Sequence, residues 1–203
     1  ADGVMVRDIT GDIRTFDHVV VATHADQALA LLDDPDDDEG TLLGCFHYSA
    51  NRAVLHSDPA LMPRRRRVWS SWNYLGLRAD GDTACVTYWM NRLQGIDDRS
   101  PMFVTLNPMR EPRADLVHHV EHYEHPQFDM ATTAAQRQLW RLQGARRTWF
   151  CGAWFGAGFH EDGLQSGLAV AEQLGGVRRP WRVADESGRI HVHPARTPAL
   201  AAA

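Results

Sequence analysis

The sequence contains no lysine, and all 21 of its basic residues are arginine. A lysine Schiff base or a lysine general base is therefore excluded as the chemistry of this chain. Cysteine is also scarce: Cys45, Cys85 and Cys151 are far apart and odd in number, which predicts neither a disulfide framework nor a paired-cysteine metal site. We therefore expect a reducing, cytoplasmic location.

Long apolar runs are missing as well. No run approaches the roughly 20 residues of a membrane-spanning helix, and no signal peptide opens the chain. The net charge of −5 argues against a general nucleic-acid-binding protein. With 203 residues, 44% hydrophobic and 23% charged, the chain is typical of a globular protein of one domain or parts of two. Because it opens at Ala1 directly on a strand-like stretch, we interpret it as part of a longer protein.

Residues 1–40 predict the start of an α/β fold. A hairpin with its turn at Thr10–Asp12 precedes the apolar run Val19–Ala22, which is typical of a strand covered on both faces. Helical spacing from Ala25 to Leu32 then completes half of an α/β crossover. The acidic run Asp33–Gly40 is expected to be a solvated loop, since like charges resist packing. A calcium loop is the alternative, but its ligand spacing does not match.

Residues 41–131 change character. Four runs rich in Val, Thr, Tyr, Trp and Phe, separated by turns such as Asp80–Asp82, predict a largely antiparallel sheet. Arg64–Arg67 are expected to form a solvated loop, and a patch for anionic head groups or phosphates is the alternative. Aromatic residues of this region either fill the core or line a pocket: Trp69, Trp72, Tyr74, Tyr88 and Trp89.

Residues 132–182 return to the α/β pattern. We expect a helix over Thr132–Gln143, a strand within 145–155, and a second helix over Leu164–Leu174 that ends at Gly175 and Gly176. The tail, 183–203, is expected to be flexible. The buried face of the second helix is predicted to carry Leu164, Leu168, Val170, Ala171 and Leu174.

The stretch Phe150–Gly176 holds seven glycines, which indicates that backbone closely approaches another group. A strand ending near Cys151 and a helix beginning near Gly163 would point free N–H groups and a positive helix dipole at a ligand that gains negative charge. Asp162 as a simple N-cap is the alternative. Three known motifs fail here. The dinucleotide fingerprint has Glu161 in place of its third glycine, the hydrolase elbow has its serine one place late, and the zinc-protease motif lacks its second histidine.

Four histidines gather in "LVHHVEHYEHPQF". On a helix His118 and His122 would share a face and could bind a metal, but the segment does not predict a convincing helix and no cysteine is near. We therefore predict no metal site and keep a metal-dependent hydrolase as a weaker alternative.

The segments "VVVATHADQAL", "TYWMNRLQ", "FVTLNP", "YEHPQFD" and above all "FCGAWFGAGFHEDGLQSGLAVAEQLG" resemble the C-terminal half of bacterial FAD-dependent oxidoreductases of the flavin amine oxidase-like superfamily. The likeness covers roughly residues 1–182. It implies an α/β fold in which a partial FAD-binding, Rossmann-like domain (1–40 and 132–182) holds an inserted antiparallel substrate domain (41–131) that covers the flavin. The strand, G-x-G-x-x-G turn and helix with which such enzymes begin would lie outside this chain.

The resemblance also implies site residues. The Gly-rich loop would lie beside the ribityl chain, and the following helix would point its start at the pyrimidine edge of the flavin. His160 is the expected acid or base, because a histidine side chain exchanges protons near neutral pH. The substrate would be lined by Trp72, Asn73, Tyr88 and Trp89. The residues expected near FAD are Ala22, Thr23, Gly152, Ala153, Trp154, Gly158, Phe159, Glu161, Asp162, Gly163 and Leu164.

Two departures from the superfamily pattern bear on the activity. The acidic residue that often bonds the ribityl chain is replaced by Ala153–Trp154, so that Glu161 or Asp162 would have to substitute for it. The lysine often found near flavin N5 is absent, which weakens amine oxidation as the reaction. Relatives often occur beside enzymes of cyclopropane or methyl-branched fatty-acid synthesis, which implies an acyl-lipid substrate and peripheral membrane contact. We expect hydride transfer between a substrate C–H bond and flavin N5. A non-catalytic partner subunit without a complete FAD site is the alternative.

Overall fold

The structure is a computed structural model that describes residues 3–75, 85–175 and 177–193. The chain divides into two compact units, residues 1–47 with 126–203 (unit 1) and residues 48–125 (unit 2). The sequence places the boundaries at 40/41 and 131/132 instead. Both of those positions fall inside helices, α2 (Asp37–Leu43) and α4 (Met130–Gln136), which explains why the units divide elsewhere.

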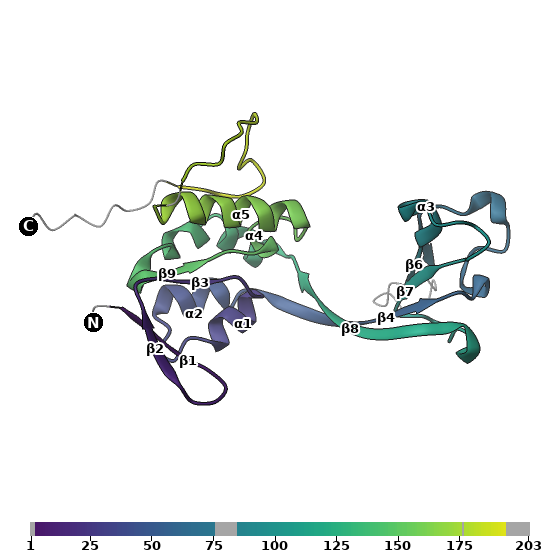
Figure 1. The fold of residues 1–203 in the computed structure, drawn as a ribbon, viewed down its shortest axis with the longest axis horizontal. Helices are drawn as coiled ribbons and strands as arrows, with labels where there is room; N and C mark the ends of the chain where they lie inside the picture. The colour runs from purple at the N-terminus through teal and green to yellow at the C-terminus, as the bar shows by residue number, and fades with distance from the viewer. Residues whose placement is uncertain (1–2, 76–84, 176, 194–203) are drawn as a thin grey trace, which may run out of the picture. The chain divides into compact units, whose positions relative to one another are not determined.

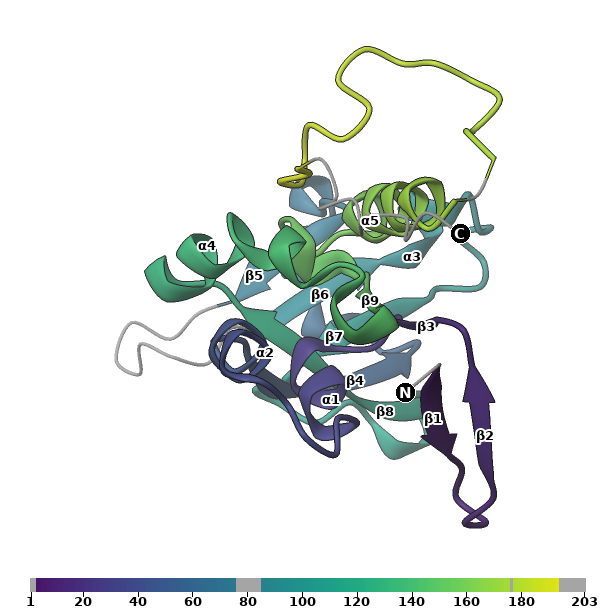
Figure 2. The same cartoon turned by 90° about the vertical axis from the view of Figure 1, so that its left-hand side faces the viewer.

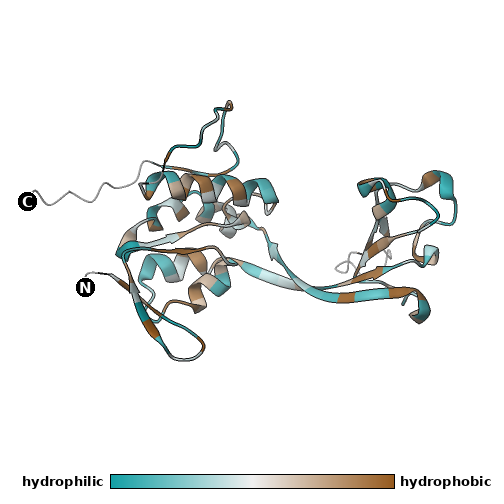
Figure 3. Cartoon of the chain, viewed as in Figure 1, coloured by the Kyte–Doolittle hydropathy of each residue, from teal (hydrophilic) through white to brown (hydrophobic). Residues whose placement is uncertain are grey.

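Unit 1 is built around two parallel strands, β3 (Val19–Val21) and β9 (Thr148–Phe150). In both cartoon views they lie between α1 (Ala25–Ala30) and α2 on one side and α5 (His160–Gln173) on the other (Figures 1 and 2). The predicted hairpin precedes them as β1 (Val4–Arg7) and β2 (Ile13–Phe16). Apolar colour marks β3 and parts of this hairpin (Figure 3). The core of unit 1 is made by Leu42, Leu43, Phe46, Leu139, Trp140, Phe150, Trp154 and Phe155.

The acidic run Asp33–Gly40, predicted to be a loop, is a loop only in its first half, and its second half forms the start of helix α2. Asp36 caps α2: its carboxylate accepts the Glu39 N–H at 2.8 Å, and the Glu39 carboxylate accepts the Asp36 N–H at 2.9 Å. Negative charge at a helix start is stabilised by the helix dipole. Glu39 is buried and pairs with Arg146, whose guanidinium also donates to the Asp34 carbonyl. Repulsion among the acids is thus offset by the cap, the dipole and one arginine.

Unit 2 is an antiparallel sheet, as the sequence predicts, and its strand order is β5-β6-β7-β4-β8. The short helix α3 (Met90–Gln94) follows β6 and packs on β7. The predicted turn at Asp80–Asp82 lies outside the described residues. The strands are β4 (His47–His56), β5 (Trp72–Leu75), β6 (Cys85–Trp89), β7 (Phe103–Leu106) and β8 (Val117–Gln127).

The two faces of this sheet differ. One, the covered face, lies beneath the segment of short 3-10 helices at 59–68. Its buried members are Val54, His56, Asn73, Cys85, Thr87, Phe103 and Thr105; Trp89 on this face is half-buried and Leu75 is exposed. The opposite face, the open face, carries no charged side chain on β5, β6 and β7. Its members are Leu55, Trp72, Tyr74, Val86, Tyr88, Val104 and Leu106. Trp72 and Tyr74 are 63% and 68% exposed and the other five are half-buried, so the face is apolar and open in part, as binding faces often are.

A buried polar chain crosses the covered face. His56 accepts the Asp58 N–H on Nδ1 at 3.1 Å, so its neutral ring carries the proton on Nε2 and donates it to the Thr105 hydroxyl at 2.7 Å. Thr105 and Thr87 share a hydrogen bond of 2.9 Å, and Thr87 donates to the Leu61 carbonyl at 3.4 Å. Both hydrogen bonds of His56 need the neutral imidazole. A charged ring would carry a proton on Nδ1 as well and would present a second donor to the Asp58 N–H.

This arrangement predicts a loss of stability in acid. Burial lowers the pKa of His56 below its usual value, the charges of Asp58 and His118 acting in opposite directions. Because the folded pKa is depressed, full stability is present above about pH 6.5, and it falls as the unfolded chain takes up the proton, by up to about 1.4 kcal/mol per pH unit. Urea unfolding from pH 7.5 to 5.5 should show this slope. His56→Gln should flatten it, whereas the exposed control His119→Gln should keep it. Equal slopes in both variants would contradict the assignment.

Candidate functional site

Three short backbone segments with small side chains meet at one end of the parallel pair. Val21 and Phe150 are register partners, and the Cys151 N–H donates to the Val21 carbonyl at 3.1 Å, so β3 and β9 end at the same level. Ala22–Thr23 follow β3, and Gly152–Ala153 follow β9. The first turn of α5 packs on this second pair. The carboxyl ends of adjacent parallel strands are where ligands bind in α/β sheets.

Gly152 allows this close packing. A Cβ on Gly152 would lie 3.3 Å from the Thr23 carbonyl oxygen and against the Trp154 indole, and its φ of 159° is one that other residues rarely adopt. A Cβ on Gly163 would make an ordinary contact, 3.6 Å from the Ala153 nitrogen, so Gly163 faces the loop without being required by it. Gly167 borders open space.

The loop is tied to α5 by Ser166. Its buried hydroxyl accepts the Gly152 N–H at 3.0 Å and lies 3.1 Å from the Gly152 carbonyl oxygen and 3.0 Å from that of Gly163. One side chain thus fixes the strand end against the helix. Ser166 was noted in the sequence only as a misplaced elbow serine, and its structural role was missed.

The helix begins earlier than predicted, at His160 with Phe159 as its N-cap residue. Asp162 is therefore not the N-cap but sits in the first turn, where its carboxylate accepts the Phe159 N–H at 2.7 Å. The side chain is fully buried and pairs with Arg189 at 2.6 Å. With both oxygens occupied, Asp162 is not free to accept a ligand hydroxyl. Glu161 is exposed and accepts a hydrogen bond from Gln165 at 2.9 Å.

Trp154 serves the core of unit 1. Its indole N–H donates to the Thr23 carbonyl at 2.9 Å, and its ring packs on Phe46 and Phe155 with centroids 5.2 and 4.4 Å away. The residue is buried, so it joins the two strand ends without lying at their surface. We therefore correct its expected place beside the ribityl chain: Trp154 positions Thr23 rather than facing a ligand.

The remaining expected residues are exposed. Gly158 packs beneath the ring of Phe128, and Phe159 lies beside the Arg189 guanidinium at 5.8 Å. His160 is exposed and forms no hydrogen bond with the residues that the structure describes. Leu164 is 54% exposed although the sequence places it on a buried face. Helix α5 buries Val170, as predicted, but its other buried residues include Gln165, Ser166 and Ala169, so the buried face is turned away from Leu164.

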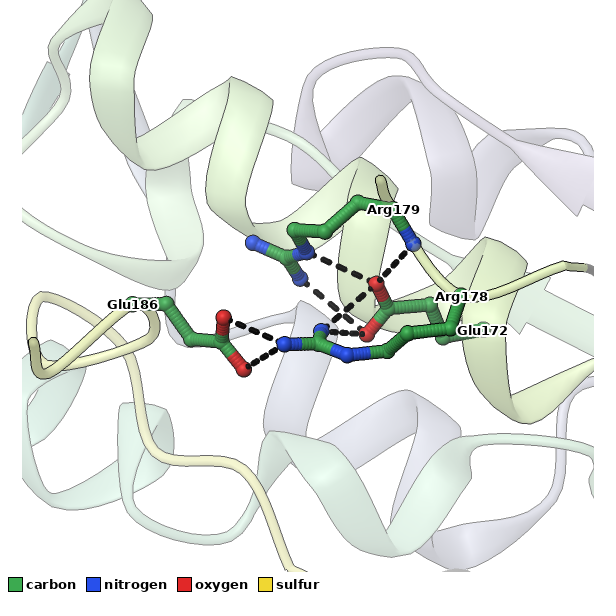
Figure 4. Close-up of polar contacts among 4 residues, drawn as sticks. All are labelled: Glu172, Arg178, Arg179 and Glu186. Carbon is green, nitrogen blue, oxygen red and sulfur yellow. Dashed lines mark hydrogen bonds and ion pairs between the residues drawn. The ribbon is translucent and has the colours of Figure 1, made fainter. Parts of the chain in front are cut away.

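The C-terminal segment is packed on α5 as far as residue 193, where the sequence predicts a flexible tail from 183. Glu172 of α5 binds Arg178 and Arg179, and Arg178 also binds Glu186 (Figure 4). Hydrogen bonds from the Arg179 side chain chiefly lower the pKa of Glu172, to about 2. Arg189 reaches the other end of α5. The Arg189–Asp162 pair joins residues 27 positions apart. The pairs of Arg178 and Arg179 span six to eight positions across the end of α5, beyond the helical spacing that the sequence analysis used.

The expected substrate-lining residues do not share a surface. Trp72 and Tyr88 are register partners on the open face, with ring centroids 5.9 Å apart. Asn73 and Trp89 lie on the covered face. Asn73 is buried and donates to the Ser70 and Thr87 carbonyls, and Trp89 packs on Trp69. Five further residues lie on the open face outside the expected substrate-lining set, and of these only Tyr74 is among the aromatic residues considered for a pocket: Leu55, Tyr74, Val86, Val104 and Leu106.

The histidine cluster lies on strand β8, not on a helix. His118 bonds the Ser57 hydroxyl at 2.6 Å, His119 pairs with Glu121, and His125 bonds Asn51 at 3.1 Å. Within the described ranges no three histidine, cysteine or acidic side chains converge as metal ligands.

No family profile matches the chain, and no curated protein matches it in sequence. Solved structures do match. Reduced UDP-galactopyranose mutase has a TM-score of 0.55 at 11% identity, over 86% of this chain and 44% of that one. A candidate protoporphyrinogen oxidase from Exiguobacterium sp. 255-15 has a TM-score of 0.58 at 11% identity, over 85% and 44%. A conjugated-linoleic-acid-producing (CLA-producing) fatty acid isomerase from P. acnes scores 0.42 at 13% identity, over 73% and 41%.

The first two matches establish the fold. The chain has an α/β architecture that matches part of a Rossmann-like domain with an inserted antiparallel sheet, as the sequence predicts. It spans less than half the length of each of these proteins. At 11% identity the likeness extends to the fold and no further.

The described helices include none that is both long enough and apolar enough to cross a bilayer.

Proposed function

We propose that this chain is the C-terminal part of an FAD-dependent oxidoreductase. One observation carries the proposal: small residues follow β3 and β9 where the two strands end side by side, and the first turn of α5 packs against them, within the fold shared with the first two solved structures. Such a surface suits close approach of a cofactor to backbone. The sequence resemblance to flavin amine oxidase-like enzymes independently favours the same cofactor.

The residues present fit a flavin. Ala22, Thr23, Gly152 and Ala153 offer little side-chain bulk at the strand ends. The N–H groups of His160 and Glu161 at the start of α5 have no acceptor within the helix, and the positive end of the helix dipole there stabilises negative charge. Bound FAD would supply hydride transfer at its N5. The role of the chain would be to hold the ring and to place positive potential at its edge.

Two expected roles change with the geometry. Asp162 and Trp154 would act as positioning residues beneath this surface, since both are buried and hydrogen-bonded to protein groups. Ala22, Thr23, Gly152, Ala153 and Leu164 remain the proposed contacts. His160 stays a proposed proton-transfer residue on its exposure alone.

The substrate is proposed to be apolar, such as an acyl lipid. The support is the open face of unit 2, where aromatic and aliphatic side chains occupy each register row of β5, β6 and β7. Binding sites for apolar ligands are lined mainly by such side chains. Trp72, Tyr74 and Tyr88 would make the contacts, and Asn73 and Trp89 would support them from the covered face.

The remainder of the FAD domain is proposed to come from residues outside this chain. Leu164, Val20 and Leu31 are 54%, 44% and 64% exposed in unit 1. Apolar side chains exposed on several elements of one unit favour cover by a further segment. The second candidate function is a non-catalytic subunit with an incomplete FAD site, which the missing half of the domain equally permits.

Flavin content separates these two functions. The protein that carries this chain, purified without added cofactor, should release FAD on heating in a ratio near one per chain. Dithionite should bleach its absorbance near 450 nm, and an acyl substrate should do so under anaerobic conditions. A preparation that neither contains FAD nor takes it up would contradict the oxidoreductase proposal and favour the non-catalytic subunit.

A further inference from the structure

Unit 2 carries a concentration of positive charge that the proposed function does not use. Arg64, Arg65, Arg66 and Arg67 follow one another in the sequence, and all four are exposed. We call them the arginine cluster. The Arg66 guanidinium pairs with Asp98 at 2.7 Å and lies 5.4 Å from the Trp69 ring centroid. The other three form no ion pair with any residue in the described ranges.

The cluster stands on a fixed turn. The Trp69 indole N–H donates to the Pro63 carbonyl at 2.7 Å, which closes the segment that carries the four arginines. The Trp69 ring packs edge-on against Trp89 and Phe103, with centroids 5.3 and 5.8 Å away. Leu61 and Met62, just before the cluster, are buried. The turn that carries the arginines therefore rests on the half-buried rings of Trp69 and Trp89 and on the buried ring of Phe103.

Apolar side chains accompany these charges. Val68 directly follows the cluster and is 59% exposed. The segment 89–98 contains α3 and contacts the turn at its two ends, through the Trp69–Trp89 rings and the Arg66–Asp98 ion pair. Within it, α3 exposes Arg92 and Leu93. Arginines beside exposed aliphatic residues match the interface of a bilayer, where guanidinium groups bind lipid phosphates and apolar side chains enter the acyl boundary.

We propose that the arginine cluster docks unit 2 on the surface of an anionic lipid bilayer. Nucleic acid fits less well, because the chain is acidic overall at −5 and the cluster is one short turn rather than a long basic stripe. The turn packs on Phe103 of the covered face, so docking there leaves Trp72 and Tyr74 on the open face uncovered. The inference does not depend on flavin binding.

Vesicle sedimentation tests the proposal with the protein that carries this chain. Vesicles of 30% phosphatidylglycerol in phosphatidylcholine should bind it, and pure phosphatidylcholine should not. Each basic residue near an anionic surface strengthens binding by about fivefold, so Arg64→Ala, Arg65→Ala and Arg67→Ala together should weaken it about a hundredfold. Val68→Ser should weaken it without a change of charge. Raising NaCl from 0.1 to 0.5 M should release the protein.

A triple variant at exposed arginines elsewhere, Arg7→Ala, Arg137→Ala and Arg182→Ala, changes the net charge equally and should bind vesicles as the unaltered protein does. Equal loss in both triple variants would overturn the proposal, because net charge alone would then drive binding. Two other results would overturn it: the protein does not bind the anionic vesicles, or it binds a DNA or RNA oligonucleotide more tightly than it binds the vesicles. Inorganic phosphate at 10 mM should not compete, and full competition would indicate a phosphate site instead.

Discussion

Ala22→Phe is expected to weaken FAD binding at least about tenfold without lowering the thermal stability of the protein. Ala22 is exposed directly after β3, where the proposed ring would lie, so a benzyl side chain would occupy the cofactor volume rather than the core. A tenfold loss corresponds to about 1.4 kcal/mol, which one displaced ring contact readily exceeds. Flavin fluorescence during titration of the stripped protein measures the dissociation constant.

The control for this variant is Ala145→Phe. Ala145 is also exposed and lies just before β9, at the opposite end of the parallel pair. Because ligands bind at the carboxyl ends of such strands, this substitution should leave FAD affinity unchanged. An equal loss of affinity in both variants, or no loss in either, would argue against the proposed site.

Arg189→Ala is expected to lower the melting temperature by roughly 5 °C, because it leaves the buried Asp162 carboxylate without its charged partner. The same change should weaken flavin retention, since Asp162 holds the first turn of α5 through the Phe159 N–H. Scanning calorimetry and flavin release on dilution measure the two effects.

The pairing itself is tested by a double-mutant cycle. Asp162→Asn removes the buried charge, so Arg189→Ala should cost much less stability in that background than alone. Arg182→Ala removes an exposed arginine of the same segment and should cost almost nothing. Additive effects of Asp162→Asn and Arg189→Ala would show that the two side chains act independently and would contradict the proposed positioning role.

Local pattern was sufficient for much of the fold. The β-branched run at Val19–Val21 became the parallel strand β3, and the aromatic runs became an antiparallel sheet. The predicted cover on both faces of β3 is wrong for this unit, because Val20 is 44% exposed. Local pattern did not predict the structure where ion pairs and helix capping determine it. Asp36 and Glu39 turned part of an acidic run into a capped helix, and Arg146, more than 100 residues later, neutralises the buried Glu39.

The site was predicted less well, for two different reasons. Asp162 resembles an N-cap in sequence, and only its contact with Arg189, 27 residues away, shows that it is buried in the first turn. No local pattern contains that information. In contrast, the sequence was sufficient to predict that Trp72 and Asn73 lie on opposite faces of the sheet. Neighbouring side chains on a strand point to opposite faces.

The most direct test of this account is an experimental structure, with FAD bound, of the protein that carries this chain. We predict that the flavin ring lies against Ala22, Gly152 and Ala153, with its pyrimidine edge at the first turn of α5 and with Asp162 still paired to Arg189. A flavin bound elsewhere in the protein, with the ends of β3 and β9 in contact with other protein segments only, would contradict the central claim.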